Sequence, residues 1–188
     1  ESLSLFLSGS KVKGAIENRA IQTVNVDSEQ INQAFNNIVL NSIHSMPHGG
    51  TLTVKIKDLR LEKDNVYLLE SGSYVRITFE DCGCGIEKEH LHKVFDPYFT
   101  TRADGTGLGL STTQSIVMKH GGYIDVVSDV NQGTTVTVIL PSYQDAPSDD
   151  GEETEKTVQS PPVGTQLLIM DDDEDIRILA SEWLSELG

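Results

Sequence analysis

Hydrophobic residues recur at two different spacings along the first 143 residues, and each spacing predicts one type of secondary structure. Apolar side chains follow the helical period over residues 29–46, after Asp27 and Ser28, either of which can cap a helix. The helical period returns over residues 87–94 and 110–120. Strand patterns occupy residues 11–17, 20–26, 51–61, 74–80, 123–128 and 134–140. The first two strands flank a polar Asn18-Arg19 turn, and Pro141 is expected to end the last strand.

These elements predict an α+β fold over residues 1–143, with about three helices on one face of a mixed sheet. The composition then changes. Residues 144–164 are rich in Asp, Glu, Ser, Pro, Gly and Thr, which predicts a disordered acidic linker. Residues 165–188 contain an apolar strand pattern, the acidic run Asp171-Asp172-Asp173, and an amphipathic helical stripe.

The formal net charge of −15 is unevenly distributed along the chain. Residues 144–188 contain 13 acidic and 2 basic residues, a net charge of −11, whereas residues 1–143 have a net charge of −4. We therefore expect no nucleic acid or anionic membrane as a partner, because phosphate backbones bind clustered Lys and Arg. A small phosphate ligand is compatible with this charge, since a metal ion and backbone N–H groups can neutralise it locally.

The sequence favours a cytoplasmic protein. It contains no run of about 18 apolar residues, and its first residues do not resemble a signal peptide. The two cysteines, Cys82 and Cys84, are too close in sequence to staple a fold, and so low a count fits a reducing compartment. Whether the full-length protein is anchored in a membrane is left open.

Three groups of residues suggest chemistry. Asn37 and Asn41 lie four apart on the predicted helix, so both amides project from one face. An amide oxygen is a hard, neutral ligand that suits a Mg²⁺ ion already bound by phosphate oxygens. Taken alone, the pair is more simply explained as two exposed helix residues.

The second group, residues 81–85, follows a predicted strand. The Asp81 carboxylate can accept a hydrogen bond from an exocyclic amino group such as that of adenine, and Gly83 and Gly85 let the backbone approach a flat base. The third group, residues 105–110, is rich in glycine and opens a helix whose first N–H groups can face phosphate. Alone, the second group is an ordinary strand-to-helix turn. The third alone is a flexible loop, which follows no strand of a βαβ unit and lacks the Lys-Ser/Thr ending of a P-loop.

The order of the motifs is more specific than any one of them. Residues 37–41 resemble the N box of sensor histidine kinases, residues 81–85 their G1 box, residues 95–101 their F box, and residues 105–110 their G2 box. Gly121-Gly122, Ser128 and Gly133-Thr134 resemble the closing strands of the same domain. The resemblance covers about residues 1–143. It implies a two-layer α/β sandwich of the Bergerat type, with a mixed, mostly antiparallel sheet, that binds ATP and Mg²⁺.

The resemblance also implies roles for particular residues. Asp81 would bond the adenine amino group, with Thr134 nearby through a water, and Asn41 would ligate Mg²⁺ with Asn37 beside it against the phosphates. Arg102 stands near a lid lysine of many relatives, and His44 stands where some relatives carry a phosphate-binding Lys or Arg. The remaining ATP-binding positions form the G1 box and the lid, where Leu108 N–H would be among the phosphate donors: Gly83, Gly85, Ile86, Gly105, Thr106, Gly107, Leu108 and Gly109.

The residue at position 37 helps to distinguish a kinase from an ATP hydrolase. Hydrolases of this fold carry a general-base Glu there, and the Asn37 amide cannot take a proton from water at neutral pH. The F box also favours a kinase. The alternatives are an ATP hydrolase and a nucleotide-binding module without catalysis.

None of the five histidines is followed by Glu or Asp, as a phosphoacceptor would be. We therefore expect the acceptor on dimerisation helices that precede Glu1. This fragment would then be a monomer, and the full-length protein a homodimer.

Residues 167–170 with Asp171 and Asp172 resemble the first strand and the Mg²⁺-binding acidic pair of a receiver domain, which would take up the phosphate in a relay. The alternative is an acidic linker that meets an amphipathic helix. About 22 residues cannot form this domain alone, so we expect no intramolecular receiver fold. A zinc site of Cys82, Cys84, His90 and His92 is disfavoured because residues two apart on a helix point away from each other. Nothing in the sequence near the cysteines predicts a reactive thiol.

Overall fold

The computed structural model describes residues 10–102 and 105–143. Along the chain the elements are β1 (Val12–Asn18), β2 (Thr23–Val24), α2 (Ser28–Ser45), β3 (Gly50–Leu61), β4 (Gly72–Asp81), α3 (Lys88–Leu91), α4 (Gly109–Lys119), β5 (Tyr123–Asp129) and β6 (Gly133–Tyr143). The predicted linker over 144–164 and the predicted receiver segment over 165–188, with Asp171 and Asp172, lie outside the described residues.

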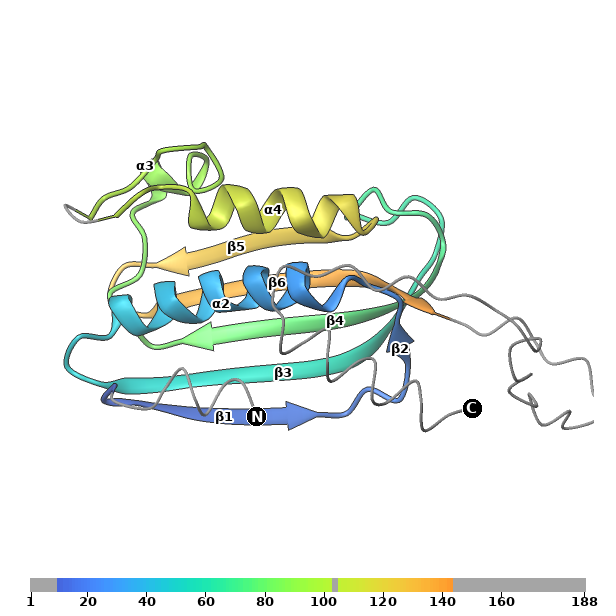
Figure 1. The fold of residues 1–188 in the computed structure, drawn as a ribbon, viewed down its shortest axis with the longest axis horizontal. Helices are drawn as coiled ribbons and strands as arrows, with labels where there is room; N and C mark the ends of the chain where they lie inside the picture. Colours follow the sequence, from blue (N-terminus) through green and yellow to red (C-terminus); the bar gives the residue numbers. More distant parts are fainter. Residues whose placement is uncertain (1–9, 103–104, 144–188) are drawn as a thin grey trace, which may run out of the picture. The chain divides into compact units, whose positions relative to one another are not determined.

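The strands form one six-stranded sheet in the order β1-β3-β4-β6-β2, with β5 also paired to β6 (Figure 1). Among the strands of residues 10–102 and 105–143, β1 and β3 pair in parallel, and the other pairs are antiparallel. In the described part of the chain, helices α2 and α4 lie side by side on one face of this sheet, and α3 lies next to β5 (Figure 1). This two-layer arrangement confirms the predicted α+β sandwich with a mixed, mostly antiparallel sheet.

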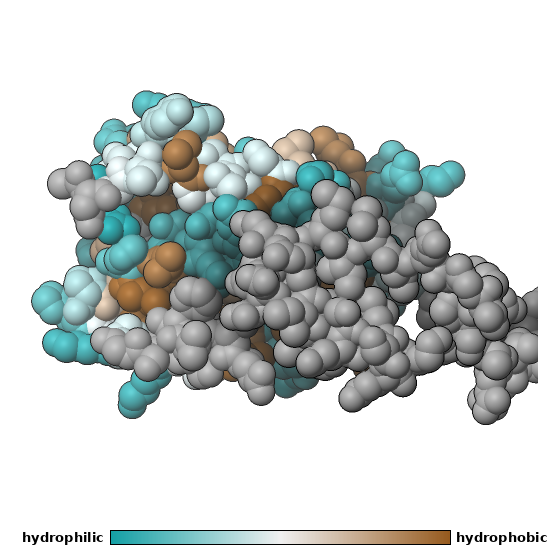
Figure 2. All heavy atoms as spheres, in the orientation of Figure 1, coloured by the Kyte–Doolittle hydropathy of each residue, from teal (hydrophilic) through white to brown (hydrophobic). Residues whose placement is uncertain are grey.

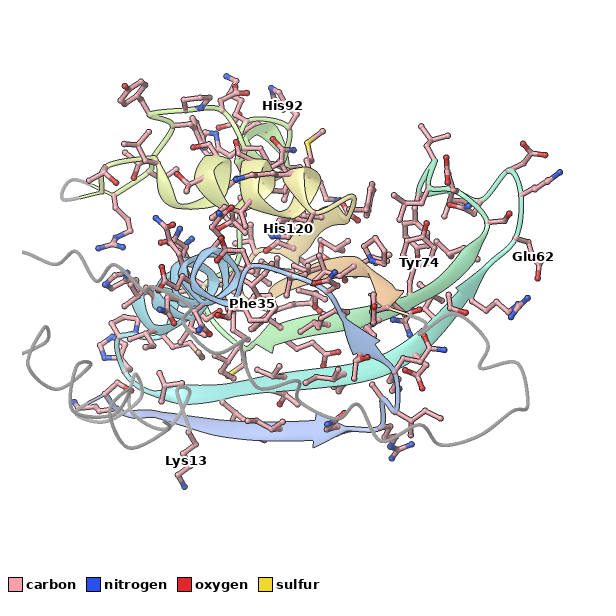
Figure 3. All side chains as sticks on the ribbon, turned by 45° about the vertical axis from the view of Figure 1, so that its right-hand side comes forward. Lys13, Phe35, Glu62, Tyr74, His92 and His120 are labelled. Carbon is pink, nitrogen blue, oxygen red and sulfur yellow. The ribbon has the colours of Figure 1, made fainter. Side chains whose placement is uncertain are left out.

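The main core lies between α2, α4 and the sheet. Alternate residues of each strand point to the helices because side chains alternate across a strand, so Val75, Ile77 and Phe79 of β4 are buried there. Phe35 lies on α2 (Figure 3), and its ring packs on that of Phe79 with the ring centroids 5.3 Å apart. Ile38, one turn further along α2, is 1% exposed. The apolar stripe of α2 therefore holds the helix against the centre of the sheet.

Helix α2 begins where the sequence predicted it. Asp27 Oδ1 accepts from the backbone N–H groups of Glu29 and Gln30, at 3.0 and 3.1 Å. The end of α4 meets the same point, because the Asp27 N–H donates to His120 Nε2 at 3.1 Å and His120 Nδ1 lies 2.8 Å from the Ile116 carbonyl oxygen. This pairing requires His120 to be neutral with its proton on Nδ1. The start of α2 and the end of α4 are thus joined.

The prediction of strands at 11–17 and 20–26 around an Asn18-Arg19 turn is confirmed in part: β1 is the first strand and includes Asn18, but the second is shortened to the two residues of β2. β1 pairs with β3, and β2 has only two residues and pairs with β6. The intervening chain is held by a carboxylate instead, since Asp58 accepts the N–H groups of Ile21 at 3.0 Å and Gln22 at 3.1 Å. Backbone donors used in this way cannot join a strand ladder, which explains why β2 is short.

Two other predicted boundaries are also wrong. β6 continues through Pro141 to Tyr143. β5 pairs with β6 as far as Ile139 and β2 pairs with it from Ser142, so Pro141 lies between these two partners, where a strand can tolerate a missing N–H. The helix predicted over 87–94 is a single turn, Lys88–Leu91, and has no side-chain cap at Glu87.

The visible surface does not present one large apolar area. In the view of Figure 2, hydrophobic residues appear in small, separate groups among hydrophilic ones, wherever the described residues can be seen. Among the described residues, no helix combines the length and the apolar composition that crossing a membrane requires.

The packing of α2 predicts a large effect for Ile38→Ala. The side chain is 1% exposed, so truncation leaves a cavity and lowers the free energy of unfolding by about 2–5 kcal/mol. Urea unfolding followed by circular dichroism measures the change. Ile21→Ala is the matched control, since Ile21 is 91% exposed and its loss should change stability by less than about 0.5 kcal/mol. Equal effects of the two substitutions would contradict this packing.

The cap of α2 predicts a dependence of stability on pH. The Gln30 N–H holds the pKa of Asp27 below its ordinary value of 3.8. A lowered folded-state pKa stabilises the fold above the unfolded value and is lost as pH falls through the folded value. Asp27→Asn keeps a capping oxygen but has no charge. The difference in unfolding free energy between wild type and Asp27→Asn should therefore be constant above about pH 5 and shrink below about pH 4. A difference independent of pH would argue against the charged cap.

Candidate functional site

The Asp81 carboxylate, at the end of β4, lies where α2, β4 and β6 meet. Its Oδ1 accepts from Gly83 N–H at 2.9 Å and from Thr134 N–H at 3.2 Å. The Ser45 hydroxyl of α2 lies 3.3 Å from the same oxygen. Oδ2 accepts no hydrogen bond from the described residues. The carboxylate is therefore oriented through one oxygen, and the other is available to a ligand.

A second group of polar residues stands behind Asp81. Ser128 Oγ donates to the Gly133 carbonyl at 2.8 Å and lies 3.0 Å from Thr134 Oγ1. The same hydroxyl accepts the Ile86 N–H at 2.8 Å. Both Ser128 and Thr134 are buried. This network fixes the strand ends and the start of the 86–92 segment around Asp81.

Ser45 and Ser128 do not appear among the site residues predicted from the sequence. Ser45 lies one helical turn after Asn41, and that spacing was the available signal. Ser128 belongs to the closing-strand motif, but its contact with Ile86 N–H depends on the fold.

Close packing explains the glycine at position 83. A Cβ there would overlap the Ser45 side chain and lie 2.9 Å from its carbonyl oxygen. The same segment is tied to α2, since the Cys84 N–H donates to the Ser45 carbonyl at 3.1 Å. A side chain at position 83 would therefore push the 81–85 segment away from α2 and misplace Asp81.

The two predicted phosphate-side elements meet at Asn37 and Gly109. Asn37 Nδ2 donates to the Gly109 carbonyl at 3.1 Å, and Thr113 Oγ1 donates to the same oxygen at 2.8 Å. A Cβ at Gly109 would lie 3.9 Å from Asn41 Nδ2, an ordinary van der Waals distance. Asn41 is exposed. The start of α4 thus rests on the face of α2 that carries both asparagines.

The segment before α4 is folded back on itself. Tyr98 N–H donates to the Gly107 carbonyl at 2.9 Å. Gly107 has φ of +69°, and a Cβ there would overlap the Tyr98 backbone, so this position needs glycine. Leu108 N–H lies 3.4 Å from Thr106 Oγ1, and α4 begins without a side-chain cap. The first N–H groups of α4 are therefore open to an anionic group.

Arg102 and His44 are in direct contact. Arg102 Nη1 lies 2.5 Å from His44 Nδ1. A guanidinium has no acceptor, so His44 must accept through Nδ1 and be neutral in this pairing. His44 lies one turn after Asn41 on α2. The contact thus brings the Arg102 side chain to the end of α2.

The structure brings the predicted residues into two groups around the end of α2. Asp81, Gly83, Gly85, Ile86 and Thr134 form the first group with Ser45. The second group contains Asn37, Asn41, His44, Arg102, Gly105, Thr106, Gly107, Leu108 and Gly109. Gly105 lies beside Thr100, where a Cβ would overlap the hydroxyl.

The residues considered for zinc are placed differently. Cys82 Sγ accepts the Thr51 N–H at 3.2 Å and lies 3.6 Å from Met46 Sδ. Among the described residues, the metal-binding atoms that cluster within 4.8 Å come from Glu87, Glu89 and His90, not from the cysteines. Two of these three are exposed, and exposed acidic groups of this kind are common on protein surfaces.

Comparisons with known proteins identify the family. Residues 26–144 match the family of histidine kinase-, DNA gyrase B-, and HSP90-like ATPases, so the chain belongs to that family. Sensor histidine kinase ZraS of Salmonella typhi is 38% identical over 124 residues, which cover 66% of this chain and 24% of ZraS. Sensor kinase CckA of Brucella abortus is 33% identical over 167 residues, covering 82% of this chain and 18% of CckA.

A solved structure supports the same assignment. The catalytic domain of histidine kinase ThkA, in a nucleotide-free form, has a TM-score of 0.59 and 26% identity, covering 74% of this chain and 85% of that one. The part of the chain that the structure describes is a catalytic domain of the histidine kinase type. The chain spans about a quarter of the length of the ZraS relatives, 24% in the Salmonella typhi protein.

The arrangement suits a nucleotide. Asp81 Oδ2 offers an acceptor beside two close-packed glycines, and the uncapped start of α4 offers backbone donors. The exposed Asn41 amide lies between these two features along α2. An oriented carboxylate at one end and N–H donors at the other match a base with an amino group and a phosphate chain.

The contact of Ser45 with Asp81 predicts a modest role in nucleotide binding. Its hydroxyl proton is shared between Asp81 Oδ1 and the Ser42 carbonyl, 2.8 Å away. Ser45→Ala should therefore weaken Mg-ATP binding by about two- to tenfold, the value of one ordinary hydrogen bond. Calorimetric titration measures it. Ser115→Ala is the control. Its exposed hydroxyl donates to the Ser111 carbonyl, so the substitution should leave affinity unchanged. Unchanged affinity in Ser45→Ala would show that Asp81 needs no such support.

Proposed function

We propose that this chain binds Mg-ATP and supplies the γ-phosphate for phosphorylation of a histidine on a separate dimerisation domain. The observation that carries the proposal is the Asp81 carboxylate, oriented through Oδ1 by Gly83, Thr134 and Ser45 with Oδ2 free for a ligand. Membership of an ATPase family and relatives that are sensor histidine kinases support the same reading.

In this proposal one group of residues contacts the adenine base and the other contacts the phosphates. Asp81 would accept the adenine amino group, with Thr134 beside it. The uncapped start of α4, including Leu108 and Gly109, would donate to the phosphates. Asn41 would ligate Mg²⁺ through its amide oxygen, and the ion would neutralise the phosphate charge.

Asn37 supports kinase chemistry over hydrolysis. Its Nδ2 is engaged with the Gly109 carbonyl, and an amide at this position cannot act as the base that activates water. Transfer needs only positioning and charge neutralisation on this domain. The acceptor imidazole nitrogen attacks the γ-phosphorus, the bond to the β-phosphate oxygen breaks, and ADP leaves. The base that takes the imidazole proton would belong to the acceptor domain.

Arg102 would contribute to the γ-phosphate end. It is held at the end of α2 by His44, one turn from Asn41. In this position the guanidinium can approach the terminal phosphate, and neutral His44 orients it rather than adding charge.

The same proposal extends to the whole protein. Dimerisation helices with the acceptor histidine would make it a homodimer. Residues 144–164 would link the catalytic domain to a receiver domain that begins at 165–188, where Asp171 and Asp172 would hold Mg²⁺ for relay to an aspartate.

Calorimetric titration with Mg-ATP tests the adenine pocket. Asp81→Asn replaces the charged acceptor and should weaken binding by about ten- to a hundredfold, since a hydrogen bond to a charged group is worth about 1.5–3 kcal/mol. Glu62→Gln is the matched control, because it removes the same charge from an exposed position on the β3–β4 loop. Its affinity should equal that of the wild type.

Two results would contradict the proposal. If the folded wild-type chain bound no Mg-ATP, the proposed nucleotide site would not exist in this chain. Equal affinity of Asp81→Asn and the wild type would show that the base is held elsewhere.

A further inference from the structure

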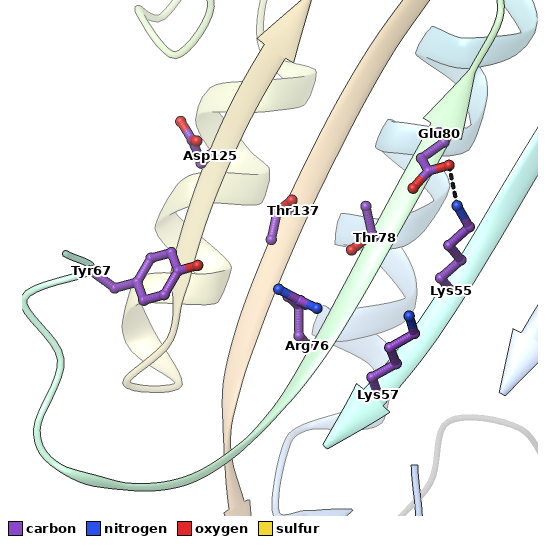
Figure 4. A pocket seen from close by; sticks show the side chains of 8 residues that line it. All are labelled: Lys55, Lys57, Tyr67, Arg76, Thr78, Glu80, Asp125 and Thr137. Carbon is purple, nitrogen blue, oxygen red and sulfur yellow. Dashed lines mark hydrogen bonds and ion pairs between the residues drawn. The ribbon is translucent and has the colours of Figure 1, made fainter. Parts of the chain in front are cut away.

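The outer face of the sheet, opposite α2 and α4, carries a polar hollow. Residues of β3, β4 and β6 that alternate with the main core point to this face. The hollow has a volume of about 330 Å³ and is open to solvent (Figure 4). Val75, Ile77 and Phe79 of β4 face the helices, and Asp81 does too, since it contacts Ser45 of α2. The hollow is therefore separate from the nucleotide site.

Two cations face each other in this hollow. Lys57 of β3 and Arg76 of β4 are directly opposite in the strand register, and Figure 4 shows them side by side. Like charges in this position destabilise a sheet. In the described part of the chain neither residue forms an ion pair. The two side chains thus bring two positive charges together on a half-buried surface.

A third cation on this face, Lys55, is already paired with a carboxylate. Lys55, two residues before Lys57, lies 2.5 Å from Glu80 Oε2. The bond to Glu80 raises the pKa of Lys55. The carboxylate of Glu80 is therefore already used, and it does not neutralise Lys57 or Arg76.

Hydroxyl groups add neutral donors beside the two cations. Thr78 of β4 and Thr137 of β6 are directly opposite each other and both line the hollow. Their hydroxyls can donate to an oxyanion without adding charge.

The Tyr67 ring forms one wall, and the β3–β4 loop holds it in place. Tyr67 packs edge-on against Tyr123, with ring centroids 5.2 Å apart. Asn65 fixes the loop: its Nδ2 donates to the Glu62 and Leu69 carbonyls at 2.9 and 2.7 Å, and its Oδ1 accepts the Tyr67 N–H at 3.2 Å. These contacts hold the Tyr67 ring in position beside the hollow.

We propose that this hollow is a binding site for a soluble phosphoryl dianion, held between Lys57 and Arg76 with Thr78 and Thr137 as further donors. Lys57 and Arg76 face each other across neighbouring strands, so the oxygens of one phosphoryl group can contact both cations at once. Arg76 supplies a planar fork of donors that fits phosphate oxygens. The net charge of −4 over residues 1–143 favours a small soluble ligand over an anionic membrane surface.

Asp125 limits the site on one side. It lies on β5, opposite Thr137, and lines the far rim of the hollow. Its carboxylate repels a dianion, so its substitution should change affinity in the opposite direction to loss of a cation. Asp125→Asn should tighten binding, while loss of either cation should weaken it.

Titration with inorganic phosphate, followed by two-dimensional ¹H–¹⁵N NMR of the whole chain, tests the proposal at constant ionic strength set with chloride. Backbone signals of residues 57, 76, 78 and 137 should shift together and saturate. Lys57→Gln and Arg76→Gln should each weaken binding by about tenfold or more, the value of one charge-assisted hydrogen bond. The same spectra show that each variant is folded.

Three outcomes would overturn the proposal. Shifts confined to residues 107–111 would place phosphate only at the start of α4, in the nucleotide site. Equal affinity in wild type, Lys57→Gln and Arg76→Gln would mean that the cation pair binds nothing. If the chain associated with vesicles of phosphatidic acid but not with soluble phosphate, the ligand would be a membrane surface and not a small soluble anion. The test does not depend on ATP binding.

Discussion

One carboxylate oxygen, Asp81 Oδ1, joins the end of β4 to α2, to β6 and to the segment that follows it. A charged acceptor with three donors is oriented strongly, because each hydrogen bond to a charged group is worth more than a neutral one. The Gly83 N–H, Thr134 N–H and Ser45 hydroxyl come from three different parts of the chain. The proposed adenine pocket therefore requires that the helix layer and the sheet are correctly packed, and this would tie nucleotide binding to the main core.

The phosphate side depends on the helix layer in the same way. Asn37 and Thr113 both donate to the Gly109 carbonyl, so the start of α4 is positioned by α2. His120 joins the opposite ends of the two helices through the Asp27 N–H. The two helices thus act as one rigid support for the donors that would face phosphate, while the segment before α4 is held by Tyr98, Gly107 and the Arg102–His44 contact.

The sequence was sufficient for features that depend on local pattern. Asp27 and the apolar spacing predicted the cap and the stripe of α2. The motifs predicted Gly83 and Thr134, which contact Asp81, but missed Ser45. Features that depend on the register between strands could not be predicted from the sequence. Alternation places Lys57 and Arg76 on the same face, but only the β3–β4 register sets them opposite each other. Pro141 and the Asp58 clamp on residues 21–22 changed predicted strand ends because their neighbours are distant in sequence.

The central claim is that this domain transfers phosphate from ATP to a histidine. The most direct measurement incubates the chain with γ-labelled ATP and a separately produced protein that contains the dimerisation helices of the full-length protein. The account predicts acid-labile, alkali-stable label on those helices, greatly reduced by Asp81→Asn, and little release of inorganic phosphate without them. Rapid release of labelled phosphate by the chain alone, with none on the helices, would contradict it and show a hydrolase.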